Sequence, residues 1–132
     1  MPFLVRDPWR KQYFDGIACP QNIVIPVDDI DAWALYPQAR HIYDRLYVAL
    51  AQCLRAGPHG VTPPTFPVFS KPIVNLKGMG IGSCIIQSRD EYNHSYRAGH
   101  FWMPVLEGPH VSTDCVVVSG QLVWARHATG VP

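Results

Sequence analysis

The sequence predicts an α+β fold, in which a mainly antiparallel sheet follows a helical N-terminal segment. Apolar residues recur at helical spacing over 28–53, whereas 66–127 alternates short β-branched and aromatic runs with glycine and proline turns. The proline-rich stretch PHGVTPPT, 58–65, separates these two patterns. We therefore divide the chain into an irregular and helical segment, 1–65, and a sheet-rich segment, 66–132.

The composition limits the size and the class of the protein. A chain of 132 residues, 48% of them hydrophobic, supports one core and is too short for two full ones. A net charge of +1 with 16% charged residues offers no basic stripe to nucleic acid. The N-terminal residues MPFLVRDPWRK lack a signal-peptide pattern, and no apolar run approaches membrane-spanning length. We expect a cytoplasmic protein with neither a nucleic-acid nor a membrane partner.

The N-terminal segment is expected to contain helices after an irregular start. Prolines and a glycine within 1–21 predict irregular chain, and 23–27 reads as a short strand that Pro26 confines to a sheet edge. Asp28 and Asp29 are placed to cap a helix from Ile30. A second helix is expected to start near Pro37, because proline is tolerated in a first turn. Its apolar stripe is Ile42, Leu46, Ala49, Leu50 and Cys53, and it should end at Gly57 and Pro58.

The sheet-rich segment is expected to begin with a hairpin and a short helix. Strands at 66–74 and 84–87 flank a glycine loop. Ser88 and Glu91 have the spacing of a capping box and predict a helix over 89–98 that Gly99 stops. Strands at 101–106, 110–118 and 121–127 follow, the last two joined by a tight turn at Ser119 and Gly120. This order predicts one sheet whose last face has little covering it.

Cysteine and histidine spacing favours structural roles. The cysteines show no CxxC pair and the histidines no HxH or HxxxH pair, so neither a disulfide framework nor a zinc site is expected. A nucleophilic thiol at Cys84 or Cys115, near His100 or His110, is a weaker alternative, because nothing in the sequence lowers a thiol pKa. Packed thiols are the favoured interpretation.

The candidate site is a lysine followed by a glycine loop. A short strand carries Lys71, and Gly78, Gly80 and Gly82 alternate in the turn beyond it. Glycine backbone admits a ligand closely, and free amides with a lysine suit a phosphate. The alternative is an ordinary hairpin turn with a solvated lysine. The loop fits neither GxGxxG, since a strand and not a helix follows it, nor GxxxxGK[ST].

The run FPVFSKP, the loop GMGIGS, the helix SRDEY and the segment WMPVLEGPHVSTDCVVVSGQLVW together resemble the nucleotide-binding half of the ATP-grasp superfamily. The match covers about 66–125 and rests on the order and spacing of these motifs. It implies an ATP-binding portion of a carboxylate-amine or carboxylate-thiol ligase. The fold class would then be the N-terminal subdomain of an ATP-grasp domain.

The resemblance also implies roles for individual residues. Lys71 would pair with phosphates, and the loop 78–83 would cover them. The 103–106 segment would offer its backbone to adenine, and Glu107 would lie near ribose. Pro104 lacks an amide, which leaves the donor in that segment open. No residue of the family clearly corresponds to Lys77. Some members place a ribose contact at the position of His110, but a histidine directly after Gly-Pro is more often a turn residue. The full set of ATP-binding residues that we expect is Lys71, Gly78, Met79, Gly80, Ile81, Gly82, Ser83, Met103, Pro104, Val105, Leu106 and Glu107.

In that family Mg²⁺ is held by acidic residues and an asparagine on later strands, which would follow Pro132. The chain is expected to be either a portion of a longer ligase, whose C-terminal half would be its partner, or a reduced relative that binds without catalysing. We assign it no catalytic and no metal residues. The second hypothesis is a non-enzymatic interaction module or a homodimer that uses the open sheet face, with Phe101, Trp102 and Trp124 available to a partner.

Overall fold

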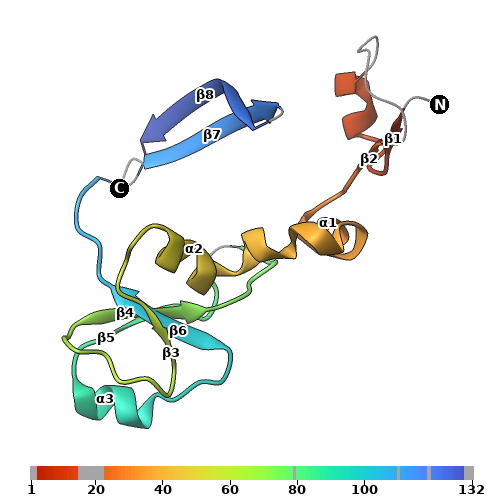
Figure 1. Cartoon of the computed structure of the whole chain (residues 1–132). Coiled ribbons are helices and arrows are strands. Elements are labelled where there is room, and N and C mark those ends of the chain that lie inside the picture. Colours follow the sequence, from red (N-terminus) through yellow and green to blue (C-terminus); the bar gives the residue numbers. More distant parts are fainter. Residues whose placement is uncertain (1–2, 15–22, 79, 110, 119, 130–132) are drawn as a thin grey trace.

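The computed structural model describes residues 3–14, 23–78, 80–109, 111–118 and 120–129. It confirms the α+β class: helices come first, then a four-stranded antiparallel sheet, then a separate hairpin (Figure 1). The order of strands in the main sheet is β3-β6-β4-β5. The bounds of these strands are β3 Gly57–Pro58, β4 Val68–Pro72, β5 Cys84–Ile86 and β6 His100–Pro104.

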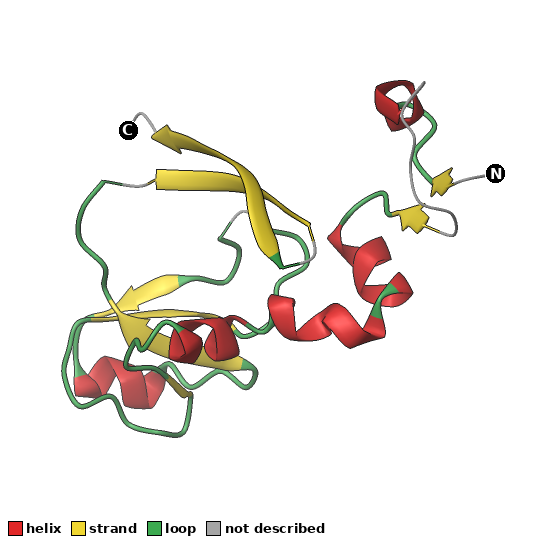
Figure 2. Ribbon diagram, turned by 45° about the horizontal axis from the view of Figure 1, so that its top comes forward, coloured by secondary structure: helices red, strands yellow, loops and turns green. Residues whose placement is uncertain are grey.

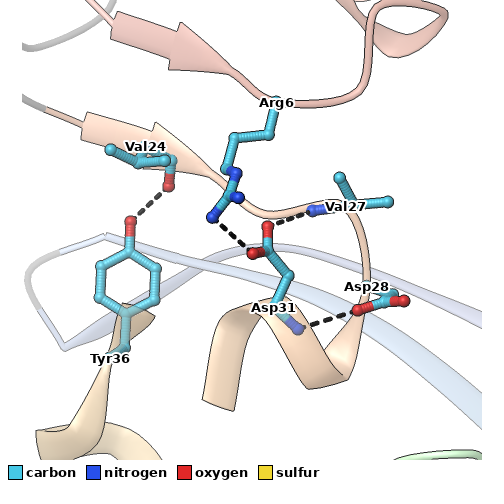
Figure 3. Close-up of polar contacts among 6 residues, drawn as sticks. All are labelled: Arg6, Val24, Val27, Asp28, Asp31 and Tyr36. Atoms are coloured by element: carbon cyan, nitrogen blue, oxygen red, sulfur yellow. Dashed lines mark hydrogen bonds and ion pairs between the residues drawn. The ribbon is translucent and has the colours of Figure 1, made fainter. Parts of the chain in front are cut away.

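The N-terminal segment is more regular than the sequence indicates. β1 (Phe3–Val5) pairs in parallel with β2 (Ile23–Ile25), and a 3₁₀ helix, η1 (Arg10–Phe14), lies between them in the sequence. Figure 3 shows the polar contacts that connect this strand pair to the first α-helix and to the residue that follows it. The Arg6 guanidinium lies 2.6 Å from an Asp31 carboxylate oxygen, and the Tyr36 hydroxyl donates to the carbonyl of Val24.

The helical segment is divided into three short helices. α1 (Asp29–Leu35) is capped as expected, since Asp28 Oδ1 accepts the Asp31 amide at 2.9 Å. The prediction of a single helix beyond Pro37 is wrong. The chain forms a 3₁₀ helix, η2 (Pro37–Tyr43), and then a separate α-helix, α2 (Arg45–Ala51). Asp44 makes the break, because its backbone is extended at ψ 96° and its carboxylate caps α2.

The predicted end of that helix and most of its stripe also need correction. α2 ends at Ala51, and Cys53 has a positive φ of 58°, so the chain turns before it reaches Gly57. Gly57 and Pro58 pair with β6 instead, which places the start of the sheet before residue 66. Of the expected stripe, Ala49 is buried and Leu46 packs against the core, whereas Ile42, Leu50 and Cys53 are exposed.

The glycine loop joins antiparallel neighbours, as predicted, since β4 pairs with β5 around it. α3 (Arg89–His94) follows with Ser88 as its cap, whose hydroxyl accepts the Glu91 amide at 3.2 Å. The Glu91 carboxylate accepts the Gln87 amide in turn. α3 ends before the predicted stop at Gly99, and its cap residue is Ser95.

The main sheet lies between α2 and α3 (Figure 1). Alternate residues along β4 point to opposite faces, so the sheet has two distinct apolar clusters. On the α3 face, Val68, Ile86 and Trp102 pack with Tyr92 of α3. On the α2 face, Phe101 and Met103 pack with Ala49 of α2.

The last two strands do not extend the main sheet, which corrects the expectation of one continuous sheet. β7 (Val111–Val118) and β8 (Gln121–Thr129) pair only with each other, and both views draw them as a ribbon apart from the sheet (Figures 1 and 2). All nine residues of β8 are exposed. None of the described helices is long and apolar enough to span a lipid bilayer.

Candidate functional site

A cavity of about 360 Å³ opens on the α2 face of the sheet. Its floor is a row of three residues that are neighbours across strands, Ile85 of β5, Phe69 of β4 and Met103 of β6. Lys71 adds one wall, and Pro104, Val105 and Leu106 add another. The cavity therefore brings Lys71 together with the predicted adenine-binding segment, at a volume within the lower part of the range of small-molecule sites.

Lys71 is the charged group of this cavity. Its ammonium lies 5.5 Å from the ring centre of Phe101 and 5.9 Å from that of Phe69, within the range of cation–π attraction. Within the described part of the chain the two ion pairs are N-terminal, Arg6 with Asp31 and Arg10 with Asp7, and no hydrogen bond reaches this ammonium. Burial lowers the pKa of Lys71, and repulsion by the Arg45 guanidinium lowers it further.

A second cavity of about 250 Å³ adjoins the first, between α2 and the sheet. The two cavities share Lys71, Met103 and Leu106, and Arg45 at the start of α2 lines the second. The described walls of both cavities contain no carboxylate. Two cations beside apolar walls, without a countercharge among the lining residues, have the chemistry that suits an anion with an apolar body.

Arg45 is held in place from two sides. Its amide donates to the Ile73 carbonyl at 2.9 Å, and its guanidinium donates to the Asn75 carbonyl at 3.3 Å. Both acceptors follow β4 directly, so the first turn of α2 is fixed to the end of the strand that carries Lys71. The sequence analysis did not select Arg45. Asp44, immediately before it, is a residue type that caps helices, and this would have placed Arg45 at the start of a helix.

The glycine loop lies at the end of β4, and its described residues, 78 and 80–83, do not line either cavity. Positive φ angles occur at Gly78, Gly80 and Gly82, as a tight turn of this kind requires. The Asn75 side chain closes the loop from within, since its Nδ2 donates to the Gly78 carbonyl at 3.0 Å. The predicted phosphate-covering role of the loop stays a prediction, and Met79 lies outside the described residues.

Phe69 and Ile85 are cavity residues that the sequence analysis did not select. The alternation of side chains along a strand could have identified Phe69. It lies two residues before Lys71, so both side chains lie on the same face of the strand. Glu107, the predicted ribose contact, is exposed and does not line either cavity.

The cysteine alternatives gain no geometric support in the described residues. Cys84 packs against the α3-face cluster and Cys115 is exposed on the hairpin. The described residues include no group of three or more His, Cys, Asp or Glu side chains placed to hold a metal ion.

No protein-family model matches the chain, and searches of curated proteins and of solved structures find no match either. The α+β class rests on the structure itself. What the cavity could bind is inferred from the residues that line it.

Proposed function

We propose that this chain binds a nucleotide, with ATP as the expected ligand, in the cavity between Lys71 and the 103–106 segment. It would be the ATP-binding portion of an ATP-grasp-like carboxylate-amine or carboxylate-thiol ligase. The observation that carries the proposal is the Lys71 ammonium, which stands without an acidic partner at the wall of an otherwise apolar cavity. A buried charge is costly unless something compensates it, and a bound anion would do so.

The apolar part of the cavity suits a flat base. Phe69, Ile85 and Met103 form an apolar floor, and Val105 and Leu106 lie beside it. The ladder between β4 and β6 ends at the pair of Val68 with Pro104, so the backbone beyond it runs along the cavity. Backbone groups at such a strand end supply hydrogen bonds to the edge of a base, which the resemblance to ATP-grasp proteins also implies.

The charged part of the cavity suits phosphates. Lys71 lines both cavities and Arg45 lines the second, so a base over the floor would direct its phosphates toward these two cations. Charge-assisted contacts to phosphate are the stronger class of hydrogen bond. The glycine loop follows Lys71 closely in the sequence, beyond the end of β4, and a phosphate-covering role for it is part of this proposal.

Isothermal titration with ATP, in the presence and absence of Mg²⁺, tests this proposal. We expect weak binding by the wild type and a loss of about tenfold or more in affinity for Lys71→Met, which corresponds to one charge-assisted contact. Lys11→Met, which removes an exposed lysine of η1, is the charge-matched control and should bind as the wild type does. Equal heats from the wild type and Lys71→Met, or no heat from either, would contradict the proposal.

A second candidate function is self-association. The expected availability of Phe101 and Trp102 to a partner is wrong, because these side chains are 0% and 5% exposed within the main sheet, so the surface that remains is the hairpin that carries Trp124. The exposed residues of β8 include Leu122, Val123 and Trp124, and an isolated two-stranded ribbon is marginally stable in water. Both edges of the ribbon are open in the described structure, which favours pairing of β8 with β8 of a second copy. Light scattering at rising concentration tests this function: a dimer that Leu122→Lys dissociates supports it, and a strict monomer with no binding of a hydrophobic dye removes it.

A further inference from the structure

The C-terminal base of the glycine loop is fastened to the turn between α3 and β6. The Gly82 carbonyl accepts from Nε2 of His100 at 3.2 Å and from the Arg97 guanidinium at 3.5 Å. A β-carbon added to Gly82 would lie 3.2 Å from the Pro72 ring, whereas one added to Gly78 or Gly80 would meet nothing within 4 Å. The loop is therefore packed at its base and open toward its tip.

The hydrogen bond to Gly82 determines which nitrogen of His100 carries a proton. A carbonyl oxygen can only accept, so His100 must carry its hydrogen on Nε2; the neutral ring then makes no hydrogen bond from Nδ1 to the Ala98 carbonyl, which lies 3.5 Å away. His100 holds the loop only in a protonation state with that hydrogen in place, and a side chain without such a donor cannot replace it.

Buried His59 holds the turn that carries both donors. Its backbone amide donates to the His100 carbonyl at 2.9 Å, and its ring Nδ1 accepts the Arg97 amide at 3.1 Å. Its Nε2 lies 2.9 Å from the hydroxyl of Ser70, which is fully buried. Because Nδ1 accepts, the hydrogen of neutral His59 must be on Nε2. The His59 ring therefore links β4 to Arg97, and the His59 backbone amide holds the other end of the segment 97–100.

A proton on His59 would break this arrangement. The added hydrogen would sit on Nδ1 and point at the Arg97 amide, so that bond would be lost. The groups around the His59 ring are the rings of Tyr92, Tyr96 and His100, at 5.2, 6.2 and 5.9 Å between ring centres, and Arg97. Burial lowers the pKa of His59, and repulsion by His100 and then by Arg97 lowers it further.

We propose that His59 and His100 anchor the glycine loop. His100 is a positioning residue that holds the Gly82 carbonyl, and His59 is the buried group whose neutral form keeps the 97–100 turn in place. Uptake of a proton by His59 then releases the base of the loop while the sheet stays paired. The proposal concerns the free protein and does not depend on a nucleotide.

The sign of the pH effect follows from the lowered pKa. The native state of His59 binds protons less readily than a released state in which its pKa returns to about 6.5. Anchoring is therefore fully present above about pH 6.5 and is lost as pH falls below it, toward the pKa of the anchored form.

Hydrogen exchange of individual amides in the ligand-free chain tests the anchor. The Ser83 amide, which donates to the Gly80 carbonyl at 3.0 Å, reports on the loop, and the amides of β4 report on the sheet. After correction for the intrinsic exchange rate, we expect Ser83 protection to be constant from pH 8 to 6.5. Below that it should fall by up to about tenfold per pH unit, while β4 protection is retained.

Variants separate anchoring from general stability. At pH 7.5, His100→Leu should lower Ser83 protection about fivefold, the typical worth of one hydrogen bond, whereas His100→Gln, which keeps an N–H donor, should restore most of it. His94→Gln, in the last turn of α3, is the control and should change nothing. His59→Leu is informative only if it folds, so the wild-type pH profile is the primary result. Ser83 protection that is independent of pH, or that falls only together with β4 protection, would overturn the proposal, as would a His100→Leu variant with wild-type protection.

Discussion

The two faces of the main sheet are made from alternate residues of the same strands. The α3 face is closed, whereas the α2 face is buried at Phe101 and Met103 and opens into a cavity beside them. On the α3 face Val68, Ser70 and Ile86 are at most 2% exposed. On the α2 face Ile85 is 45% exposed, and among the described residues the ammonium of Lys71 has neither an ion-pair nor a hydrogen-bond partner. The first face satisfies its polar groups internally, and the second leaves a charge and a cavity available to a ligand.

Along β4, residues that stabilise the fold therefore alternate with residues that are available to a ligand. Ser70 is fully buried and lies within hydrogen-bonding distance of His59, whereas its neighbour Lys71 carries a charge that no carboxylate of the described residues pairs with. Groups that lower stability persist where they serve binding. We therefore expect apolar truncations to cost more stability on the α3 face than on the α2 face, and a substitution of Lys71 to have the opposite sign.

The largest expected effect is on the closed face. Ile86→Ala should lower the free energy of unfolding by about 2–5 kcal/mol, because it removes a fully buried side chain and leaves a cavity. Ile85→Ala, one residue earlier on the open face, should cost less than about 1 kcal/mol. Urea unfolding of both variants checks this, and equal costs would remove the distinction between the faces.

The polar pair of the closed face comes next. Ser70→Ala should cost about 1–3 kcal/mol, because it leaves the buried Nε2–H of His59 without an acceptor. Ser112→Ala on the exposed hairpin is the matched control and should be neutral. Thermal unfolding at pH 7.5 measures the stability of both variants. If Ser70→Ala is as stable as the wild type, the contact between Ser70 and His59 does not contribute to stability.

A smaller effect of opposite sign is expected at Lys71. Lys71→Met should raise the free energy of unfolding by up to about 1 kcal/mol, since it replaces an uncompensated charge by an apolar side chain of similar length. Because the pKa of Lys71 is lowered, the wild type gains stability as pH rises and the ammonium loses its proton, so the difference should narrow in alkali. Denaturant unfolding at pH 7 and pH 10 tests this, and a destabilised variant would mean that the charge is compensated within the protein.

The smallest effect is expected away from both faces. Trp124→Ala should change the stability of the main sheet by less than about 0.5 kcal/mol, because this tryptophan is 49% exposed on the hairpin. Trp102→Ala is the contrast, since that ring is 5% exposed and its indole N–H donates to the Val61 carbonyl at 2.6 Å. Unfolding followed by exchange of β4 amides separates the two, and similar losses would show that the hairpin supports the sheet.

The sequence predicts local features of the fold better than it predicts how they assemble. The caps at Asp28 and Ser88 and the hairpin around the glycine loop are each set by neighbouring residues, and all three are confirmed. The break at Asp44 was missed because an apolar stripe continues across it. The pairing of Gly57–Pro58 with β6 was missed because it depends on residues over forty positions away.

The candidate site shows the same division. Lys71 and the 103–106 segment were selected from the sequence and share a cavity. Arg45 was missed, since only the folded chain brings the start of α2 beside the end of β4. The loop of Gly78 to Ser83 was recognised as a loop, but what it contacts at its base, His100, is set by a turn far along the chain.

Methyl chemical shifts recorded while ATP is added give the most direct test of the nucleotide site. Ile85, Met103, Val105 and Leu106 line the cavity, whereas Val68 and Ile86 lie on the closed face. We predict saturable shifts of the first group, no shifts of the second, and an ATP concentration at half-saturation that is about tenfold or more higher in Lys71→Met. Shifts confined to the closed face, or no shifts at millimolar ATP, would contradict the assignment of this cavity as a nucleotide site.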